Sequence, residues 1–483
     1  MQTIKDILFG VSLQSLTGDR EATVKGIAFD SRKVESEFLF VAVKGLTVDG
    51  HDFINKAIEL GASVIVCESI PESQKEGVTF VQTNNASEAL GIIASNFYGR
   101  PSEKIKLVGI TGTNGKTTCA TLLFELFQNM GYAVGLLSTV ENRINNDVID
   151  SKFTTPDAVE INRLLAQMVE SGCTHCFMEV SSHALVQHRV TGIQFAGGVF
   201  TNISHDHLDY HKTFDEYIAA KKLLFDGLPS DAFALVNADD RRGSVMLQNT
   251  KADKHKMAIH SMADFKVRII HNTLQGLELN VGGIDVWFRL IGEFNAYNIM
   301  TAFAVAVLLG EEKEDVLSSL STTQGASGRF EKVNNSSNVL AIVDYAHTPD
   351  ALENVLKTIE ELRTKNETLV TVVGCGGDRD KSKRPEMARI AATLSNKVIL
   401  TSDNPRTENP KEILEDMRAG IPKSLERNVM VIEDRKEAIR TACNLASKED
   451  IILVAGKGHE TYQEIKGVRE HFDDREILNE LLN

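Results

Sequence analysis

A glycine-rich segment at residues 107–118, Leu-Val-Gly-Ile-Thr-Gly-Thr-Asn-Gly-Lys-Thr-Thr, restricts the possible folds of this chain more than any other feature. An apolar run precedes it, and apolar residues with helical spacing follow over 120–126. Strand, glycine loop and helix in that order surround a phosphate with backbone N–H groups, while Lys116 reaches the outer phosphates and Thr117 can hold Mg²⁺. The segment predicts a nucleoside triphosphate site, although its first glycine, Gly109, stands one residue earlier than the standard spacing requires.

Composition limits the size of the domains and the class of partner. With 483 residues the chain is too long for one core, so we expect roughly two to four domains. The net charge is −15 and no sustained basic face is evident, which argues against nucleic acid or an anionic membrane as the main partner. The sequence shows neither an N-terminal signal pattern nor an apolar run of about 18 residues, so we expect a soluble cytoplasmic protein.

Two small clusters have more than one interpretation. Cys173 and Cys176 form a C-x-x-C pair, but the pair runs into an apolar strand and no second pair exists. We therefore favour core packing over zinc binding or redox chemistry. Lys381, Lys383 and Arg384 form a basic cluster that suits a phosphate or a carboxylate.

The pattern of strands and helices divides the chain into three α/β domains. We predict a small mixed α/β N-terminal domain over 1–100, a central P-loop ATPase-like domain with a mostly parallel sheet over 101–329, and a C-terminal Rossmann-like domain over 330–483. Gly and Pro in Phe97-Tyr98-Gly99-Arg100-Pro101-Ser102 mark the first boundary.

The last domain repeats a strand followed by a polar loop, at 344–347, 374–379, 403–406 and 456–460. Because the carboxyl ends of parallel strands line one crevice, these loops predict a second binding surface. The second loop is not a dinucleotide fingerprint, since Arg379 stands where the third glycine is required. Nicotinamide binding is therefore not expected.

The central domain carries candidate metal ligands. Glu179 closes an apolar strand, and an acid in that position beside a phosphate loop commonly helps to hold magnesium. The segment 201–211, Thr-Asn-Ile-Ser-His-Asp-His-Leu-Asp-Tyr-His, suggests zinc or magnesium, and we favour magnesium with His207 as the ligand. Lys221 and Lys222 lie in the middle of a predicted helix, a position where most lysine pairs are simply solvated.

Four motifs together closely resemble the Mur ligases, the ATP-dependent amino-acid-adding enzymes of peptidoglycan synthesis. They are Gly-Ile-Thr-Gly-Thr-Asn-Gly-Lys-Thr-Thr, Met-Glu-Val-Ser-Ser-His, Thr-Asn-Ile-Ser-His-Asp-His-Leu-Asp-Tyr-His and Asp-Tyr-Ala-His-Thr-Pro-Asp. The resemblance covers essentially the whole chain and is strongest to members that add meso-diaminopimelate to UDP-N-acetylmuramoyl-L-Ala-D-Glu. It implies that the three domains bind the UDP-sugar, ATP and the amino acid in that order.

The resemblance also implies residue roles around ATP and metal. Lys221 is implied to be carbamylated by CO₂, which turns a cation into an anion that can ligate Mg²⁺. The implied catalytic residues are Lys116, Lys221, His207 and Glu179, and the implied metal ligands are Thr117, Glu179, His207 and the Lys221 carbamate. The implied ATP contacts are Gly112, Thr113, Asn114, Gly115, Lys116, Thr117, Thr118, Asn295, Asn298, Arg329 and Asp344, with His347 in support.

Two further residue sets are implied for the other substrates. The UDP-sugar peptide would contact Ser31, Thr154, Thr155, Ser181, Gln187 and Arg189. Diaminopimelate would contact Arg379, Asp403, Asn404, Pro405, Arg406, Gly456 and Glu460. Arg406 fits this substrate chemically, because a guanidinium grips the second carboxylate of diaminopimelate and repels the ammonium of lysine.

The expected reaction is acyl transfer through an acyl phosphate, with ATP as co-substrate and Mg²⁺ offsetting negative charge. The expected partners are small-molecule substrates, and the expected state is a monomer. The alternatives are the lysine-adding ligase of the same family, a folate polyglutamate ligase and a non-catalytic nucleotide-binding regulator.

Overall fold

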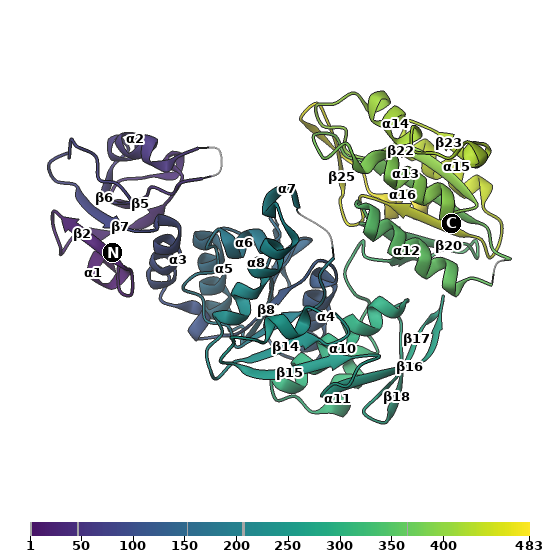
Figure 1. Ribbon diagram of the computed structural model, residues 1–483, viewed down its shortest axis with the longest axis horizontal. Coiled ribbons are helices and arrows are strands. Elements are labelled where there is room, and N and C mark those ends of the chain that lie inside the picture. Colours follow the sequence, from purple (N-terminus) through teal and green to yellow (C-terminus); the bar gives the residue numbers. More distant parts are fainter. Residues whose placement is uncertain (1, 46–47, 152, 205–207, 365) are drawn as a thin grey trace. The chain divides into compact units, whose positions relative to one another are not determined.

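The computed structural model describes residues 2–45, 48–151, 153–204, 208–364 and 366–483 (Figure 1). Contacts divide the chain into two units. The first consists of Met1–Val267 and Tyr297–Leu320, and the second of Arg268–Ala296 and Ser321–Asn483. No helix within the described ranges combines the length and the apolar character needed to cross a membrane.

The N-terminal part of the first unit is a five-stranded sheet with helices on both faces. Its strand order is β2 (Leu13–Thr17), β7 (Thr79–Thr83), β6 (Ala62–Cys67), β5 (Phe38–Val41) and β4 (Gly26–Ala28). Because side chains alternate along β5, Leu39 packs into the core with α3 (Ala86–Phe97), while Phe40 packs into the core with α2 (Ile54–Glu59). Shorter elements here are β1 (Gln2–Thr3), α1 (Ile4–Ile7), β3 (Thr23–Val24), η1 (Ser31–Lys33) and η2 (Gly50–Phe53).

The central sheet of the first unit is parallel from β9 to β15, as predicted. From one edge its order is β11 (Asp147–Asp150), β10 (Glu141–Ile144), β9 (Val134–Leu137), β12 (His175–Glu179), β8 (Lys106–Thr111), β13 (Gly197–Phe200), β14 (Phe233–Asn237) and β15 (Asp253–Ala258), and β15 pairs in parallel with the start of the next strand at Phe265 and Lys266. The phosphate-loop strand β8 lies between β12 and β13, so both neighbouring strands end beside the loop. Helices here are α4 (Lys116–Asn129), α5 (Ala158–Glu170), α6 (Ser182–Val186), α7 (Leu208–His211), α8 (Phe214–Asp226), α9 (Gly243–Met246) and α11 (Lys313–Leu320), with the turn η3 (Pro101–Glu103).

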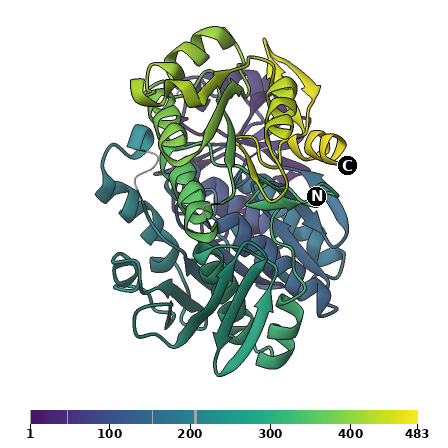
Figure 2. The same ribbon diagram turned by 90° about the vertical axis from the view of Figure 1, so that its right-hand side faces the viewer.

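The second unit contains a six-stranded sheet that is parallel except for its edge strand β19. Helices lie on both sides of it, as Figure 2 shows, and the Rossmann-like prediction is confirmed. The strand order is β19 (Glu331–Val333), β20 (Leu340–Asp344), β24 (Ile451–Ala455), β21 (Leu369–Cys375), β22 (Lys397–Ser402) and β23 (Val429–Val431). The helices are α12 (Pro349–Leu362), α13 (Lys383–Leu394) and α14 (Pro410–Arg418) on one face, and α15 (Arg435–Leu445) and α16 (Asp474–Leu482) on the other; η4 (Lys423–Asn428) precedes β23.

Sequence patterning did not predict two antiparallel hairpins of the second unit. One pairs β17 (Gly276–Val281) with β18 (Ile284–Phe288), and the other pairs β25 (Tyr462–Ile465) with β26 (Val468–His471). The strands of the second hairpin are partly or fully exposed and give a weak apolar pattern. In β17, by contrast, Leu277, Leu279 and Val281 are buried and alternate with polar residues, a signal that sequence reasoning did not use. The remaining elements are β16 (Phe265–Thr273) and α10 (Glu293–Leu308), which both continue from one unit into the other.

Candidate functional site

The predicted phosphate loop has the expected strand–loop–helix geometry. Gly112 and Gly115 have φ angles of 152° and 85°, and a Cβ on Gly112 would lie 1.9 Å from Thr201 Oγ1. Glycine is therefore required where the loop passes β13. Gly115 directly precedes helix α4 and has no side chain that could cap it. The backbone N–H groups at the start of α4 are therefore not capped by the side chain of this residue. An anion is the ligand that this helix end suits.

Residues after β13 hold the loop in place. Asn202 accepts a hydrogen bond from Thr113 N through its backbone oxygen at 2.9 Å, and from Asn114 N through Oδ1 at 3.0 Å. Thr201 Oγ1 donates to the backbone oxygen of Asn114 at 2.6 Å. The Thr-Asn that begins the histidine-rich segment therefore supports the phosphate loop, a role that sequence reasoning did not assign.

Two lysines contact the same backbone atom of the loop. Lys116 Nζ donates to Gly112 O at 3.0 Å and to Thr113 O at 2.9 Å. Lys221, on α8, donates to Gly112 O at 2.8 Å and lies 4.5 Å from the centre of the Tyr217 ring. Only 1% of Lys221 is exposed. Lys221 therefore differs from most lysines on a helix face, which are solvated, because its amine is buried at the phosphate loop.

Hard oxygen donors lie at the carboxyl ends of β8 and β12. The fully buried carboxylate of Glu179 accepts hydrogen bonds from Thr139, from N to Oε1 at 2.7 Å and from Oγ1 to Oε2 at 3.2 Å. Thr139 Oγ1 also lies 3.1 Å from Thr154 Oγ1. Carboxylate and hydroxyl oxygens of this kind, the latter on the buried Thr117, suit Mg²⁺. The predicted ligand His207 lies outside the described residues.

Four of the six residues predicted for the UDP-sugar peptide form one hydrogen-bonded cluster. Thr155 Oγ1 donates to the backbone oxygen of Glu179 at 2.8 Å and accepts from Ser181 N at 3.0 Å. Arg189 Nη1 donates to Thr155 O at 2.7 Å, and Arg189 Nε donates to Gln187 Oε1 at 3.0 Å. Residues up to 34 positions apart in sequence thus meet at the end of β12.

Ser31 lies apart from that cluster in the sequence and in its contacts. It is the first residue of η1, a short turn that Asp30 caps by accepting from Arg32 N at 3.0 Å. In the described part of the chain no hydrogen bond joins Ser31 to the cluster around Thr155.

The two asparagines predicted to contact ATP, Asn295 and Asn298, are both buried on α10. Asn295 Nδ2 donates to Ile291 O at 2.8 Å, which closes the first turn of the helix. Asn298 Oδ1 lies 3.3 Å from the Cys119 thiol in α4, and a Cβ on Gly115 would lie 2.7 Å from the same oxygen. Burial raises the pKa of Cys119 to about 12, so this thiol remains a donor to Asn298.

Asp344 and Arg329, both predicted to contact ATP, lie near each other in the second unit. Backbone N–H groups at 2.6 and 2.7 Å hold the two carboxylate oxygens of Asp344. Burial raises the pKa of Asp344, and the charge of Arg329 opposes that shift. The Arg329 guanidinium lies 4.6 Å from the centre of the Tyr345 ring. His347 is exposed, and its Nδ1 lies 2.9 Å from Tyr345 O.

The loops that follow β21 and β22 pack backbone against backbone. Gly377 N donates to Asn404 O at 2.9 Å, and a Cβ on Gly377 would lie 1.9 Å from Pro405 O. Arg406, with a φ of 53°, donates from Nη1 to Gly377 O at 2.7 Å. Arg379 is exposed on the first of these loops.

The loop that follows β24 joins the same cluster. Asn404 Nδ2 donates to Glu460 Oε2 at 2.7 Å across 56 residues of sequence. A Cβ on Gly456 would lie 2.6 Å from Asp403 Oδ2, so glycine is needed there. The structure therefore brings together three of the polar loops predicted to line one crevice, because they all follow carboxyl ends of adjacent parallel strands.

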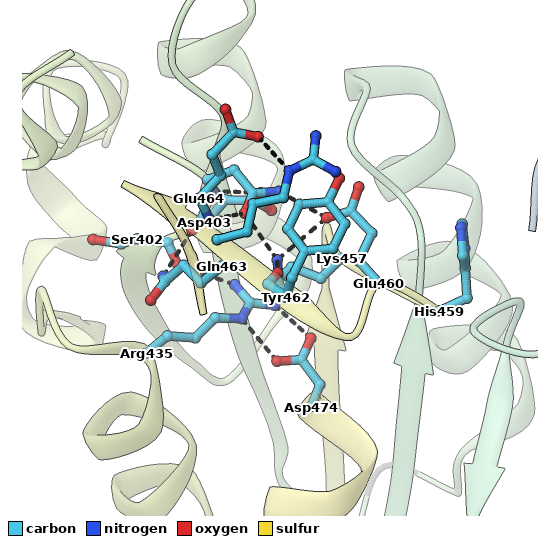
Figure 3. A network of polar contacts seen from close by, with 12 residues as sticks. Ser402, Asp403, Arg435, Lys457, His459, Glu460, Tyr462, Gln463, Glu464 and Asp474 are labelled. Carbon is cyan, nitrogen blue, oxygen red and sulfur yellow. Dashed lines mark hydrogen bonds and ion pairs between the residues drawn. The ribbon is translucent and has the colours of Figure 1, made fainter. Parts of the chain in front are cut away.

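A buried ion pair beneath these loops was missed by sequence reasoning (Figure 3). Arg435 on α15 and Asp474 on α16 are joined by two hydrogen bonds of 2.8 Å, and both side chains are fully buried. The guanidinium also donates to Ser402 O at 3.3 Å and Ala455 O at 3.1 Å, where β22 and β24 end. Isolated charged residues on two distant helices gave no signal for this contact.

Two further predictions have clear outcomes. Cys173 and Cys176 are free thiols buried in the hydrophobic core, so core packing is confirmed. The basic cluster does not face a ligand through Arg384, which is 1% exposed and pairs with Glu408 at 2.8 Å and Asp416 at 2.9 Å. Of the two predicted partners, a phosphate or a carboxylate, Arg384 has the carboxylate, and it is supplied by the chain itself.

Fold and site together define a three-domain α/β enzyme with a phosphate loop, and comparison with known families identifies the class. The model described as Mur ligase family, catalytic domain matches residues 23–98, the Mur ligase middle domain matches 110–306, and the Mur ligase, glutamate ligase domain matches 328–458. The chain belongs to the Mur ligase family.

Individual relatives within this family share one enzyme name. A UDP-N-acetylmuramoyl-L-alanyl-D-glutamate–2,6-diaminopimelate ligase from Cytophaga hutchinsonii is 59% identical over 481 residues, covering 99% of each chain. One from Phocaeicola vulgatus is 51% identical over 478 residues, again covering 99% of each. A solved structure with the same enzyme name superposes with a TM-score of 0.71 at 31% identity, covering 100% of this chain and 98% of the other.

Proposed function

We propose that this chain is an ATP-dependent ligase that joins meso-2,6-diaminopimelate to the D-glutamate γ-carboxylate of UDP-N-acetylmuramoyl-L-Ala-D-Glu. The observation that carries the proposal is the hydrogen bond between Asn404 and Glu460, beside Arg406. The relatives of this chain that bear the name of this enzyme support it. We further propose domains over 1–100 for the UDP-sugar, 101–329 for ATP and 330–483 for the amino acid.

The phosphate loop is the proposed site of the ATP phosphates. Amides at the start of α4 and the Lys116 ammonium would bind oxygens of the β- and γ-phosphates. Lys116 would exchange its bonds to Gly112 O and Thr113 O for bonds to phosphate. Further proposed contacts to the nucleotide come from Gly112, Thr113, Asn114, Gly115, Thr117, Thr118, Asn295, Asn298, Arg329 and Asp344.

Mg²⁺ fits the oxygen donors near this loop. Bound there, it would reduce the repulsion between the triphosphate and the attacking carboxylate. Thr117 and Glu179 would be ligands, and Lys221 would become one only as a carbamate, because an ammonium repels a metal ion. His207 is proposed as a further ligand.

The proposed reaction has two steps. The γ-carboxylate oxygen of the D-glutamyl residue attacks the γ-phosphorus of ATP, and the bond to ADP breaks. The amine at the L centre of diaminopimelate, after losing a proton, attacks the resulting acyl phosphate, and inorganic phosphate leaves as the amide forms. The chain's contribution is to hold two anions in contact, through Lys116 and the loop amides, and so stabilise the charge of the transition state.

Amino-acid selection is proposed to depend on charge. Within the described residues Arg406 hydrogen-bonds through its backbone and Nη1, so other guanidinium N–H groups are available for a carboxylate of diaminopimelate. Glu460 would bind an ammonium group. Lysine lacks the second carboxylate, so its ammonium would face Arg406 with no anion to offset the repulsion. Additional proposed contacts are Arg379, Asp403, Asn404, Pro405 and Gly456.

The cluster at the end of β12 is proposed to bind the muramoyl dipeptide. Arg189 and the hydroxyls of Thr154 and Ser181 offer donors for carboxylate and carbonyl oxygens, and Gln187 orients the arginine. Thr155, whose hydroxyl donates to Glu179 O, is proposed as a further contact. Ser31 is proposed to contact the uridine part. We also propose that the protein acts as a monomer in the cytoplasm, where ATP is available.

Phosphate release tests the proposal. Purified protein receives Mg-ATP, bicarbonate and UDP-N-acetylmuramoyl-L-Ala-D-Glu, with meso-diaminopimelate or L-lysine in parallel. We expect release that depends on diaminopimelate and is lost in Lys116→Met, whereas Lys251→Met, an exposed lysine in the same unit, retains it. Release with lysine alone would favour the lysine-adding alternative. No release with either amino acid would favour the nucleotide-binding regulator.

A further inference from the structure

Lys457 is a buried lysine that no role assigned so far explains. It lies between Gly456 and Gly458, whose φ angles are 116° and 53°. This backbone, which residues with a Cβ rarely adopt, forms a tight turn after β24. Lys457 itself is 0% exposed. A lysine is rarely buried unless its ammonium has partners, so the contacts of this group define its role.

The ammonium of Lys457 has three acceptors around it (Figure 3). Nζ donates to Asn404 Oδ1 at 3.1 Å, to Glu460 Oε2 at 3.2 Å and to the backbone oxygen of Tyr462. Asn404 Oδ1 also accepts from Glu464 N at 2.9 Å. Two donors at one oxygen fix the orientation of the Asn404 amide, because the opposite orientation would face NH₂ with NH groups.

Glu460 is oriented by the same contacts. Its Oε2 accepts from both Asn404 Nδ2 and Lys457 Nζ, whereas within the described residues its Oε1 makes no hydrogen bond. The groups that face Glu460 also include the carboxylate of Asp403, the guanidinium of Arg435 and the phenols of Tyr345 and Tyr462. One oxygen is thus held by the protein, and the other remains available.

Charge supports this division of roles. Burial and then the charge of Asp403 raise the pKa of Glu460, whereas Lys457 lowers it. Arg435 is already paired with Asp474 at 2.8 Å, so Lys457 is the cation that pairs directly with Glu460. Without Lys457, two carboxylates would face each other in a buried site, and Glu460 would hold a proton more readily.

We propose that Lys457 is a positioning residue for the amino-acid substrate, which orients Asn404 and Glu460 so that Glu460 Oε1 receives the ammonium group of a diamino acid. This inference rests on the proposed function. Lys457 itself does not contact the substrate. It acts by fixing an amide orientation and by keeping a neighbouring carboxylate ionised.

The first test is Lys457→Met, which keeps the length of the side chain and removes its charge and donors. Lys436→Met, at an exposed ion pair with Glu480 in the same domain, is the matched control. We expect the KM for diaminopimelate to rise about 10- to 100-fold, the effect of losing a hydrogen bond to a charged group, while KM for ATP and for the UDP-sugar peptide changes less than about twofold. Equal increases for all three substrates would overturn the proposal.

The pH profile separates positioning from simple packing. In Lys457→Met the pKa of Glu460 rises, so the acidic limb of kcat/KM for diaminopimelate shifts to higher pH, whereas the profile for ATP keeps its position. Glu460→Gln combined with Lys457→Met should cost little more than Glu460→Gln alone, because both changes remove one interaction. An unshifted acidic limb or fully additive losses would contradict the proposal.

Folding of the variants is checked by circular dichroism. If Lys457→Met does not fold, Lys457→Gln, which retains a donor for Asn404 and Tyr462, takes its place in the same assays. Failure of both variants to fold would show Lys457 to be a structural core residue and overturn the proposal. If the unmutated protein releases no phosphate with diaminopimelate, the proposed function fails instead, and the two failures are distinguished.

Discussion

Lys221 Nζ lies 2.8 Å from the carbonyl oxygen of Gly112, so a lysine of α8 contacts the phosphate loop directly. Lys116 donates to the same oxygen at 3.0 Å. Two ammonium groups at one acceptor repel each other, and a carbamate on Lys221 would replace this repulsion with attraction. The geometry gives the proposed modification a physical reason that the sequence alone did not offer.

Lys221→Met tests that reason. The variant loses the group that can carry a carbamate, and we expect kcat to fall by about 10² or more, since it lacks an anion that would hold Mg²⁺. Protein equilibrated with ¹³C-bicarbonate should give a carbamate carbon resonance in NMR spectra that the variant lacks. Lys222→Met, whose ammonium pairs with Asp226 on the exposed side of α8, is the control and should keep both signal and activity. A signal in both variants would refute carbamylation at Lys221.

Gly112→Ala should impair nucleotide binding beyond the effect of backbone strain. Its Cβ would lie 1.9 Å from Thr201 Oγ1, at a φ of 152°. Gly131→Ala is a matched control, because Gly131 has a φ of 88° and open space around its Cβ position. The control should lose about 1–2 kcal/mol of stability and keep its KM for ATP. Gly112→Ala should raise KM for ATP at least about tenfold, measured by phosphate release, and an unchanged KM would show that the loop tolerates a side chain.

Sequence reasoning found the parts of the site that follow from topology. Asn404 and Glu460 are 56 residues apart, yet both follow strands of one parallel sheet, so their proximity could be predicted. Lys457 could not be predicted in the same way. A lysine between two glycines normally indicates an exposed turn, and its burial depends on acceptors, at Asn404 and Tyr462, that only the folded domain supplies.

Two contacts of the C-terminal part were not predicted, for different reasons. The carboxylate partners of Arg384, Glu408 and Asp416, are 24 and 32 residues away, so only the folded domain identifies them. The hairpin of β17 and β18 was missed although Leu277, Leu279 and Val281 alternate with polar residues and the Gly-Gly pair between the strands suits a two-residue turn. The local pattern therefore contained the signal for the hairpin, whereas the ion pairs depend on tertiary contacts.

Arg406→Ala tests the choice of amino acid. Loss of the guanidinium removes a partner for the second carboxylate, and we expect kcat/KM for meso-diaminopimelate to fall about 100-fold or more. Turnover of L-lysine should stay unchanged or increase, because a repulsive cation has been removed. Phosphate release measured with each amino acid gives the ratio of the two kcat/KM values. Arg440→Ala, at an exposed ion pair with Glu437, is the control, and an equal loss with both amino acids would refute a role for Arg406 in selection.

Glu408 makes the stability of the C-terminal domain depend on pH. The hydrogen bond from Arg384 and then that from the backbone of Asp378 lower the pKa of Glu408 from its ordinary value of 4.5 to about 2. A depressed pKa means that the carboxylate stabilises the fold fully above pH 4.5 and loses this contribution as pH falls to 2. Glu408→Gln removes this carboxylate. Arg384, which is 1% exposed, then keeps its ion pair with Asp416.

We therefore expect Glu408→Gln to lower the free energy of unfolding by about 1–3 kcal/mol at pH 7, measured by urea unfolding with circular dichroism. Glu386→Gln, at an exposed pair 3.9 Å from Arg389, should change it by less than about 0.5 kcal/mol. Because the unmutated protein loses the Glu408 contribution on acidification, the difference between it and Glu408→Gln should shrink from pH 4.5 and vanish near pH 2. A difference that stays constant over this range would mean that Glu408 stabilises the domain by packing and not by its charge.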